Sequence, residues 1–236
     1  MQMSKLEYSA YQELKKNNLL TFKIKDLQLL LNINKTSIYN LVKALKKKGI
    51  IKSVGKGFLA FSEANDFSTA VILNSPSYIS FWSALNFYGF SDQMPKIIFS
   101  ASVKRSPKIN SFKYITLSKE RFFGYTLVDG ITIAEKEKAI IDSLLFPKYA
   151  GGIKEVIKCI KSALNEIDID KLLNYALKTK SKAVLRRLGF ILEELNFKGK
   201  ILKVMKNLIG KGYELLDPNL KKANNFNKKW LLDVNY

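Results

Sequence analysis

The feature that most constrains this chain is the apolar pattern of residues 35–48, because its start, its period and its end are all defined. Apolar residues recur at i, i+3, i+4 and i+7, which is the spacing of one helical face. They are Ile38, Leu41, Val42 and Leu45. Asn34 precedes the run with a side chain that can cap a helix, and Gly49 follows it as a stop. The pattern therefore predicts an amphipathic helix with one buried and one polar face.

Shorter elements on both sides of this helix extend the prediction to a domain of residues 1–62. In chain order they are a helix around residues 6–14, a short strand at 22–24, a short helix over 25–31, a turn at 32–34, and strand-like runs at 50–54 and 58–61 joined by a turn at 55–57. Three helices followed by a hairpin are the order of a winged helix-turn-helix, a common DNA-binding motif. We therefore predict a DNA-binding domain over residues 1–62.

The distribution of charge also favours a polyanionic partner at this end of the chain. The protein has 40 Lys and Arg against 20 Asp and Glu, a formal net charge of +20. Residues 1–62 carry 12 Lys and 3 acidic residues, so they are about twice as basic per residue as the remainder. A positive field of this size concentrates nucleic acid near the surface. A solvated lysine-rich surface without a partner is the alternative explanation of the composition.

The polar face of the predicted helix carries side chains that suit duplex DNA. These are Lys35, Thr36, Ser37, Tyr39, Asn40, Lys43 and Lys47. An α-helix fits the major groove, and Thr36, Ser37 and Asn40 are suited to contact base edges there. The lysines and Tyr39 are better suited to phosphates, which position a protein without reading sequence. We predict double-stranded DNA as the partner of this face.

Other basic residues are predicted to add contacts. Lys52 and Lys56 lie on the predicted hairpin, where a wing can approach the DNA backbone or minor groove. A second basic group, predicted to contact a partner or nucleic acid, comprises Lys178, Lys180, Lys182, Arg186 and Arg187. For the N-terminal domain the alternatives are a helical subdomain with solvated lysines or a winged helix used for protein contacts. For the second basic group the alternative is a solvated helix face.

The sequence offers no catalytic constellation. The chain has no His, which excludes Ser-His-Asp triads and His-based zinc sites, and it has one Cys, which excludes Cys-rich metal sites. No P-loop occurs. Asp168-Ile169-Asp170 resembles a pair of metal-binding carboxylates, but it directly precedes an apolar-periodic helix and is better explained as a helix cap. We therefore predict a protein that is not an enzyme and has no cofactor and no metal.

Residues 63–236 are predicted to form a larger α+β domain, with an α/β part over 68–134 and a helical part over 135–236. The predicted elements are a helix at 77–88, strands at 96–101 and 112–117, a hairpin at 124–134 that turns at Asp129-Gly130, and helices near 135–146, 152–164, 170–179, 182–196 and 199–210. The polar tail contains Trp230-Leu231-Leu232, which we expect to dock on the core. The whole chain is thus predicted to be α+β and mostly helical.

The sequence also predicts a cytoplasmic protein. Cys159 lies in an apolar helical stretch, so we expect a buried, unreactive thiol, and a single Cys is consistent with a reducing compartment. No apolar run reaches the roughly 18 residues of a membrane span. The first residues, MQMSKLEYSAYQELKK, lack the apolar region of a signal peptide.

Four stretches, in this order and spacing, resemble the AbiEi-like antitoxins of abortive-infection toxin–antitoxin systems. They are the winged helix-turn-helix; the segment 77–95 with Tyr78, Ser80, Ser83-Ala84-Leu85, Tyr88-Gly89, Gln93 and Pro95; the segment 134–142 with Glu137-Lys138-Ala139 and Asp142; and the segments 187–193 and 227–235. The resemblance implies that the N-terminal domain binds repeats in its own promoter and represses the operon. It also implies that the C-terminal domain counteracts a nucleotidyltransferase-type toxin, without a stable complex in the type IV description.

Two alternatives remain open from the sequence. One is a stand-alone winged-helix transcription factor whose C-terminal domain binds a ligand or a protein, with the aromatic cluster Phe81, Trp82, Phe87 and Tyr88 near a pocket. The other is a metal-dependent nuclease or RNA-processing factor. A neighbouring toxin gene would favour the antitoxin, and cleavage of labelled nucleic acid with Mg²⁺ would favour the nuclease.

Overall fold

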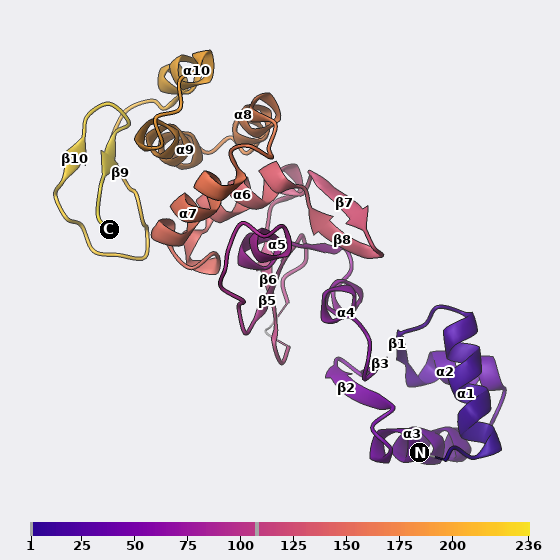
Figure 1. Cartoon of the computed structure of the whole chain (residues 1–236). Helices are drawn as coiled ribbons and strands as arrows, with labels where there is room; N and C mark the ends of the chain where they lie inside the picture. The colour runs from indigo at the N-terminus through magenta and orange to yellow at the C-terminus, as the bar shows by residue number, and fades with distance from the viewer. Residues whose placement is uncertain (1, 107–108) are drawn as a thin grey trace.

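A computed structural model, which describes residues 2–106 and 109–236, shows an α+β fold that is mostly helical, as predicted. The first unit contains three helices and a three-stranded antiparallel sheet with the order β1-β3-β2. Its elements are α1 (Lys5–Lys16), β1 (Thr21–Lys23), α2 (Ile24–Leu31), α3 (Lys35–Lys47), β2 (Ile51–Gly55) and β3 (Phe58–Phe61). This is the predicted order of helices and hairpin, and it occupies one end of the molecule (Figure 1).

The second unit is built around a mixed five-stranded sheet with the order β6-β5-β4-β8-β7. The β4–β8 and β5–β6 pairs are parallel, and the β4–β5 and β7–β8 pairs are antiparallel. Its elements are α4 (Asp66–Leu73), β4 (Ser77–Ile79), α5 (Phe81–Phe87), β5 (Ile98–Ser102), β6 (Phe112–Thr116), the 3-10 turn η1 (Lys119–Arg121), β7 (Tyr125–Val128) and β8 (Ile131–Ala134). The predicted hairpin is confirmed, with its turn at Asp129-Gly130.

The prediction of one helix over residues 77–88 is wrong at its start. Residues 77–79 form strand β4, and helix α5 begins only at Phe81. Phe81 has a φ of 55°, outside the right-handed helical region, so the backbone changes direction between strand and helix. Helix α4 was not predicted, because the polar residues 63–66 suggested only a boundary between domains.

The second half of the chain is helical, and the five predicted helices are confirmed. They are α6 (Lys136–Leu145), α7 (Ile153–Ala163), α8 (Ile169–Lys178), α9 (Lys182–Glu194) and α10 (Lys200–Leu208), with a 3-10 turn η2 (Pro147–Tyr149) after α6. Asp168 caps α8 by accepting a hydrogen bond from the Lys171 amide at 3.0 Å, as its position before an apolar-periodic helix predicted. Helix α6 is buried along most of its length and packs against α5, α7, α8 and α9.

The C-terminal tail folds back and closes the helical part. It forms a small sheet of β9 (Glu214–Leu215), β10 (Phe226–Asn227) and β11 (Leu232–Asp233), with β11 in the centre (Figure 1). Trp230 is fully buried, and its indole Nε1 donates a hydrogen bond to Glu193 of α9 at 2.7 Å. Gly189 is needed beneath it, because a Cβ there would lie 2.1 Å from the Trp230 ring. The predicted docking of this segment is confirmed.

A buried polar network joins strand β4 to helix α6. The Asp142 carboxylate accepts hydrogen bonds from the Tyr78 hydroxyl at 3.0 Å and the Ser80 hydroxyl at 2.8 Å, and it pairs with the Lys138 ammonium. All four residues are fully buried. Burial lowers the pKa of Lys138, an effect that the Asp142 charge opposes. Burial, assisted by the Asp142 charge, raises the pKa of Tyr78 well above its usual value.

Candidate nucleic-acid interface

Helix α3 presents the polar face that its sequence predicted. Its N-terminus is fixed by Asn34, whose Oδ1 accepts a hydrogen bond from the Ser37 amide at 2.8 Å. The opposite face, with Ile38, Leu41, Val42 and Leu45, is buried against the rest of the first unit. Six of the seven predicted side chains are exposed, and Ser37 is half-buried. Packing of the apolar face thus turns Thr36, Asn40 and Lys43 toward solvent together.

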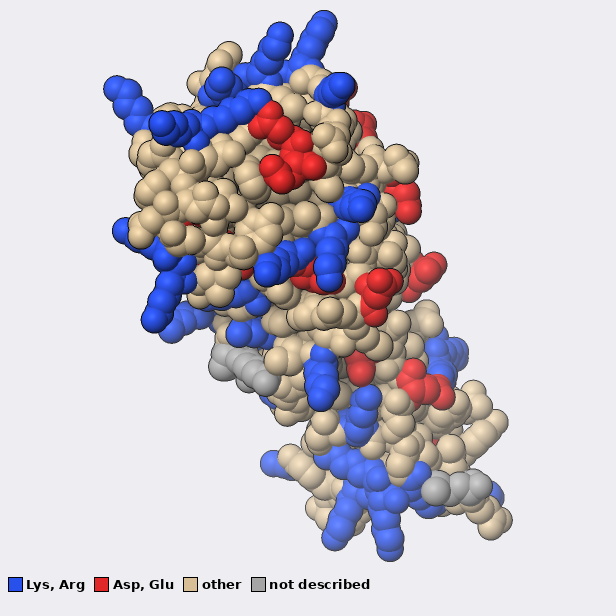
Figure 2. Space-filling model, turned by 60° about the vertical axis from the view of Figure 1, so that its left-hand side comes forward, with Lys and Arg blue, Asp and Glu red and all other residues tan. Residues whose placement is uncertain are grey.

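The cations of α3 are free of acidic partners. Within the described part of the chain, no carboxylate lies within 4.0 Å of the ammonium groups of Lys35, Lys43 and Lys47. Residues 35–62 contain no Asp or Glu, so the hairpin brings no acid to this face. Figure 2 shows a dense group of Lys and Arg side chains at the end of the molecule that the first unit forms. Unpaired ammonium groups on one helix suit the phosphates that flank a DNA groove.

Lys46 belongs to the same basic face but was not predicted as a site residue. It is exposed, and its ammonium donates a 2.7 Å hydrogen bond to the hydroxyl of Ser53 on β2. Helical spacing could have identified it, because Lys46 lies three residues after Lys43 and seven after Tyr39. The contact couples the C-terminal part of α3 to the hairpin.

The hairpin departs from its predicted role, because its tip packs on the second unit. The Lys56 ammonium donates hydrogen bonds to Asn74 at 3.0 Å and Ser106 at 2.9 Å. Gly55 lies so close to Ile109 that a Cβ would come within 2.3 Å of that side chain. The hairpin tip is therefore not a freely projecting wing, although Lys56 is exposed and its contact with DNA stays a prediction.

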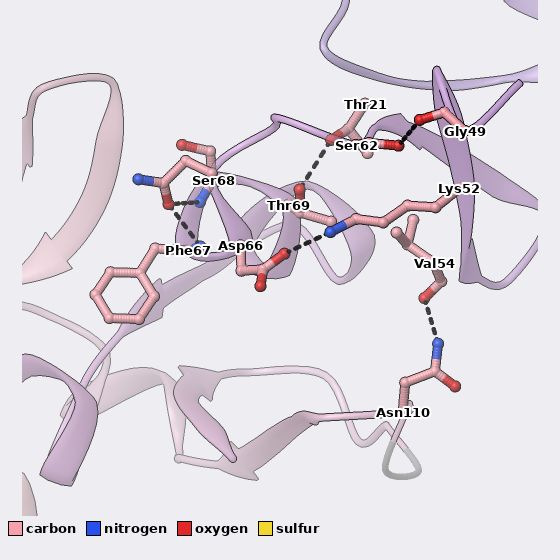
Figure 3. A network of polar contacts seen from close by, with 11 residues as sticks. Thr21, Gly49, Lys52, Val54, Ser62, Asp66, Phe67, Ser68, Thr69 and Asn110 are labelled. Atoms are coloured by element: carbon pink, nitrogen blue, oxygen red, sulfur yellow. Dashed lines mark hydrogen bonds and ion pairs between the residues drawn. The ribbon is translucent and has the colours of Figure 1, made fainter. Parts of the chain in front are cut away.

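Lys52 is also engaged at this joint between the two units. Its ammonium pairs with Asp66 of α4 at 3.2 Å, which corrects the prediction of a free phosphate contact (Figure 3). Two further contacts cross the same joint: Asn110 donates to the Val54 carbonyl at 3.3 Å, and the Thr21 and Thr69 hydroxyls lie 3.1 Å apart. The hairpin therefore fastens the first unit to the second.

The second predicted basic group divides between surface and core. Lys178, Lys180 and Lys182 are exposed. Arg186 and Arg187 are only 2% and 4% exposed, so they do not join the three lysines in one exposed basic surface, as the prediction of a single group requires. Each guanidinium instead donates to two main-chain carbonyls that end nearby elements: Ile209 and Lys211 for Arg186, and Leu144 and Leu215 for Arg187. The planar fork of Arg suits such double contacts.

Other sequence predictions concern reactivity and cofactors. Cys159 is buried as predicted, and burial raises the pKa of its thiol to about 12. In residues 2–106 and 109–236, no three His, Cys, Asp or Glu side chains gather as they would around a metal ion. The helices of those same residues include none with the length and apolar character to cross a membrane.

Comparison with known proteins bears on the fold. No protein-family model matches the chain, and no curated protein matches its sequence. Among solved structures, the chain is similar to the Rv2827c protein from Mycobacterium tuberculosis, with a TM-score of 0.71 and 12% sequence identity. The likeness covers 98% of this chain and 92% of that one, so the two proteins share an architecture over nearly their whole length. The protein is thus an α+β protein whose N-terminal unit combines three helices with a three-stranded antiparallel sheet.

Proposed function

We propose that this protein is a DNA-binding regulator that reads duplex DNA with the exposed face of α3. The observation that carries the proposal is the set of unpaired ammonium groups of Lys35, Lys43 and Lys47 around Asn40 on a helix whose other face is buried. In this arrangement Asn40 contacts a base edge, for which adenine is the partner that an amide pairs with bidentately. The lysines hold the flanking phosphates.

The contacts of the β2–β3 hairpin with the second unit limit which side chains can reach DNA. Since Lys52 and Lys56 contact the second unit, the proposed interface consists of the exposed face of α3, Lys46 included, without a free wing. One helix contacts only a few base pairs, so strong specificity requires two copies on repeated half-sites. This agrees with the promoter repeats that the AbiEi resemblance implies.

We further propose that the regulator is an antitoxin that represses its own operon and counteracts a nucleotidyltransferase-type toxin. The resemblance described from sequence supports this role. The structure adds that Tyr78, Ser80, Lys138 and Asp142, taken from two of the resembling stretches, meet in one buried network. Those residues would maintain the C-terminal domain rather than contact the toxin.

The test of DNA recognition is binding of the purified protein to the DNA upstream of its own gene and to a scrambled duplex of equal length, across a salt series. We expect the upstream duplex to bind more tightly at every salt concentration, and Asn40→Ala to remove that preference. Lys158→Ala, an exposed lysine on α7, is the matched control and should leave it intact. Equal affinity of the wild-type protein for both duplexes would contradict the proposal.

The antitoxin role is tested separately by co-expression with a nucleotidyltransferase encoded beside the gene. We expect growth to be restored by the wild-type protein and also by Asn40→Ala, because toxin neutralisation is assigned to the other domain. Failure of the wild-type protein to restore growth would contradict the antitoxin role and leave DNA recognition standing.

A further inference from the structure

The second unit contains a pocket of about 370 Å³ where the end of α6, η2, the start of α9 and the segment after β9 meet. Its lining mixes apolar and polar side chains, and the polar ones come from three separate segments. They are Lys148 of η2, Ser181 and Arg187 at the N-cap and within α9, and Asn219 after β9. This volume lies within the range of small-molecule sites in proteins.

Arg187 contributes a buried positive charge to this pocket. Its guanidinium donates to the carbonyls of Leu144 at 2.8 Å and Leu215 at 3.1 Å, and within the described residues no carboxylate lies within 4.0 Å of it. Glu214, one of the two nearby acids, lies 3.8 Å from Arg186 instead. The Arg187 Nε is buried and has no hydrogen-bond partner within the described chain, which leaves one donor for an anion beside it.

Asp217, the second nearby acid, is also occupied. One carboxylate oxygen accepts from the Ile153 amide at 2.9 Å, and the other accepts from the main-chain and side-chain nitrogens of Asn219 at 2.9 and 2.7 Å. Its side chain is buried and does not line the pocket. The two carboxylates therefore have hydrogen-bond or ion-pair partners of their own, and their charges only oppose the effect of burial, which lowers the pKa of Arg187.

Further donors surround the same space. Lys148 is exposed at the rim, where its ammonium lies 4.9 Å from the Tyr149 ring centroid. Ser181 is the N-cap of α9, and Ala183 lies in the first turn of that 13-residue helix, where main-chain N–H groups have no partner within the helix. Asn219 also lines the pocket, with its side-chain nitrogen donating to Asp217. These donors and the two cations would act on one ligand group.

The absence of acids distinguishes this pocket from two other cavities of the described chain. The cavity of about 570 Å³ between α4 and α5 is lined by Asp66 as well as Lys96, and the cavity of about 140 Å³ at β9 is lined by Glu214 and Asp233. Among the described lining residues of the α6–α9 pocket there are two cations and no carboxylate. Its field therefore favours an anion, and its apolar walls favour an organic one.

We infer that this pocket binds a phosphate monoester carried by a small organic ligand, with Arg187 and Lys148 on the phosphate and the Phe146, Pro147 and Pro218 wall against the remainder. Phosphate fits this donor set because it offers three acceptor oxygens and a charge of nearly −2 at neutral pH. The inference is independent of DNA recognition, because the pocket lies in the second unit and uses none of the α3 residues.

The test is calorimetric titration of the full-length protein at moderate salt with inorganic phosphate, AMP and adenosine. We expect saturable binding of AMP, weaker binding of phosphate, and none of adenosine, which lacks the anion. Lys148→Ala should weaken AMP binding about tenfold, the effect of losing one charge-assisted contact. Lys158→Ala, which removes an equally exposed charge on α7, should leave it unchanged.

A second arm identifies the source of the phosphate. It compares AMP with a short oligonucleotide that carries either a 5′-phosphate or a 5′-hydroxyl, using Lys43→Ala/Lys47→Ala protein so that α3 contributes little. Tighter binding of AMP assigns the site to a free nucleotide-like ligand, and tighter binding of the 5′-phosphorylated strand assigns it to a nucleic-acid end. Both results retain a phosphate site.

Two results would overturn the inference. One is the absence of saturable binding of all phosphate-bearing probes up to about 10 mM, because a dissociation constant weaker than that indicates no formed site. The other is equal weakening by Lys148→Ala and Lys158→Ala, which would indicate general attraction to a basic protein. Arg187→Lys, which keeps the charge but loses the fork, should also weaken AMP binding, and its melting temperature reports whether the fold is retained.

Discussion

The positive charges of α3 and those of the second unit are used in opposite ways. On α3, Lys35, Lys43 and Lys47 are exposed and have no acidic partner within the described chain. In the second unit, Lys138 is fully buried against Asp142, and Arg187 is buried against main-chain carbonyls. The same residue types therefore supply a free surface in one region and internal support in the other. Net charge therefore identifies a binding face only when the burial and the ion pairing of the individual Lys and Arg side chains are also known.

The largest effect is expected from breaking the buried pair. Asp142→Ala leaves the Lys138 ammonium buried without its partner and also removes the acceptor of Tyr78 and Ser80. The free energy of unfolding should fall by about 3–5 kcal/mol. Urea denaturation measures this. The double variant Lys138→Met/Asp142→Leu should be less destabilised than Asp142→Ala, and an unchanged midpoint for Asp142→Ala would contradict the structural role.

The exposed face should respond in the opposite sense. Asn40→Ala should reduce the preference for the upstream duplex by about 1–3 kcal/mol, the discrimination of one bidentate base contact. Its free energy of unfolding should stay within about 0.5 kcal/mol of wild type, because the side chain is exposed. Competition binding and urea denaturation measure the two quantities. A destabilised protein with unchanged preference would reverse the assignment.

A comparison of Lys56 with Lys47 tests the engaged hairpin. Lys56→Ala removes two hydrogen bonds to the second unit, so the free energy of unfolding should fall by about 1 kcal/mol, with the salt dependence of DNA binding unchanged. Lys47→Ala should leave stability unchanged and reduce the salt slope by about 1. If Lys56→Ala reduces the slope as much as Lys47→Ala, the hairpin contacts DNA and opens from the joint when it binds.

The smallest effect concerns acid stability of the first unit. The Lys48 ammonium lies 2.5 Å from Glu7, and this hydrogen bond is the main cause that lowers the pKa of the carboxyl. A lowered pKa stabilises the fold above the ordinary pKa of about 4.5, and this contribution disappears as pH falls through the folded-state value. The melting temperature of Glu7→Gln should therefore be lower than that of the wild type at pH 7 and equal to it near pH 3. A difference that persists at pH 3 would contradict the ionic origin.

Local patterns in the sequence were sufficient to predict α3 and its exposed face. The period of Ile38, Leu41 and Val42 and the cap at Asn34 lie within a dozen residues, so no distant contact decides the helix. The hairpin was predicted on the same basis, but its orientation depends on Asn74 and Ser106, which lie 18 and 50 residues from Lys56. No local spacing encodes that contact.

The buried arginines show a second limit of charge-based prediction. The sequence predicts a contact with a partner or nucleic acid for Arg186 and Arg187, with a solvated helix face as the alternative, yet residues 184–192 of α9 are all buried. The run Val184–Leu192 is apolar on every side of the two arginines, a composition typical of a buried helix, and this signal could have corrected the prediction. The carbonyl acceptors Ile209 and Leu215 are distant in sequence and could not have been predicted.

Whether DNA binds to the α3 face or is attracted only by the net charge of +20 can be measured directly with two triple variants. The measurement compares the salt dependence of upstream-DNA binding for wild type, Lys35→Ala/Lys43→Ala/Lys47→Ala, and Lys154→Ala/Lys158→Ala/Lys161→Ala. The second triple variant removes three exposed lysines of α7 and so has the same net charge as the first. If α3 binds the phosphates, its triple variant should lower the slope of log K against log salt by roughly 2 to 3, while the α7 variant retains the wild-type slope. Equal losses in the two variants would contradict the claim.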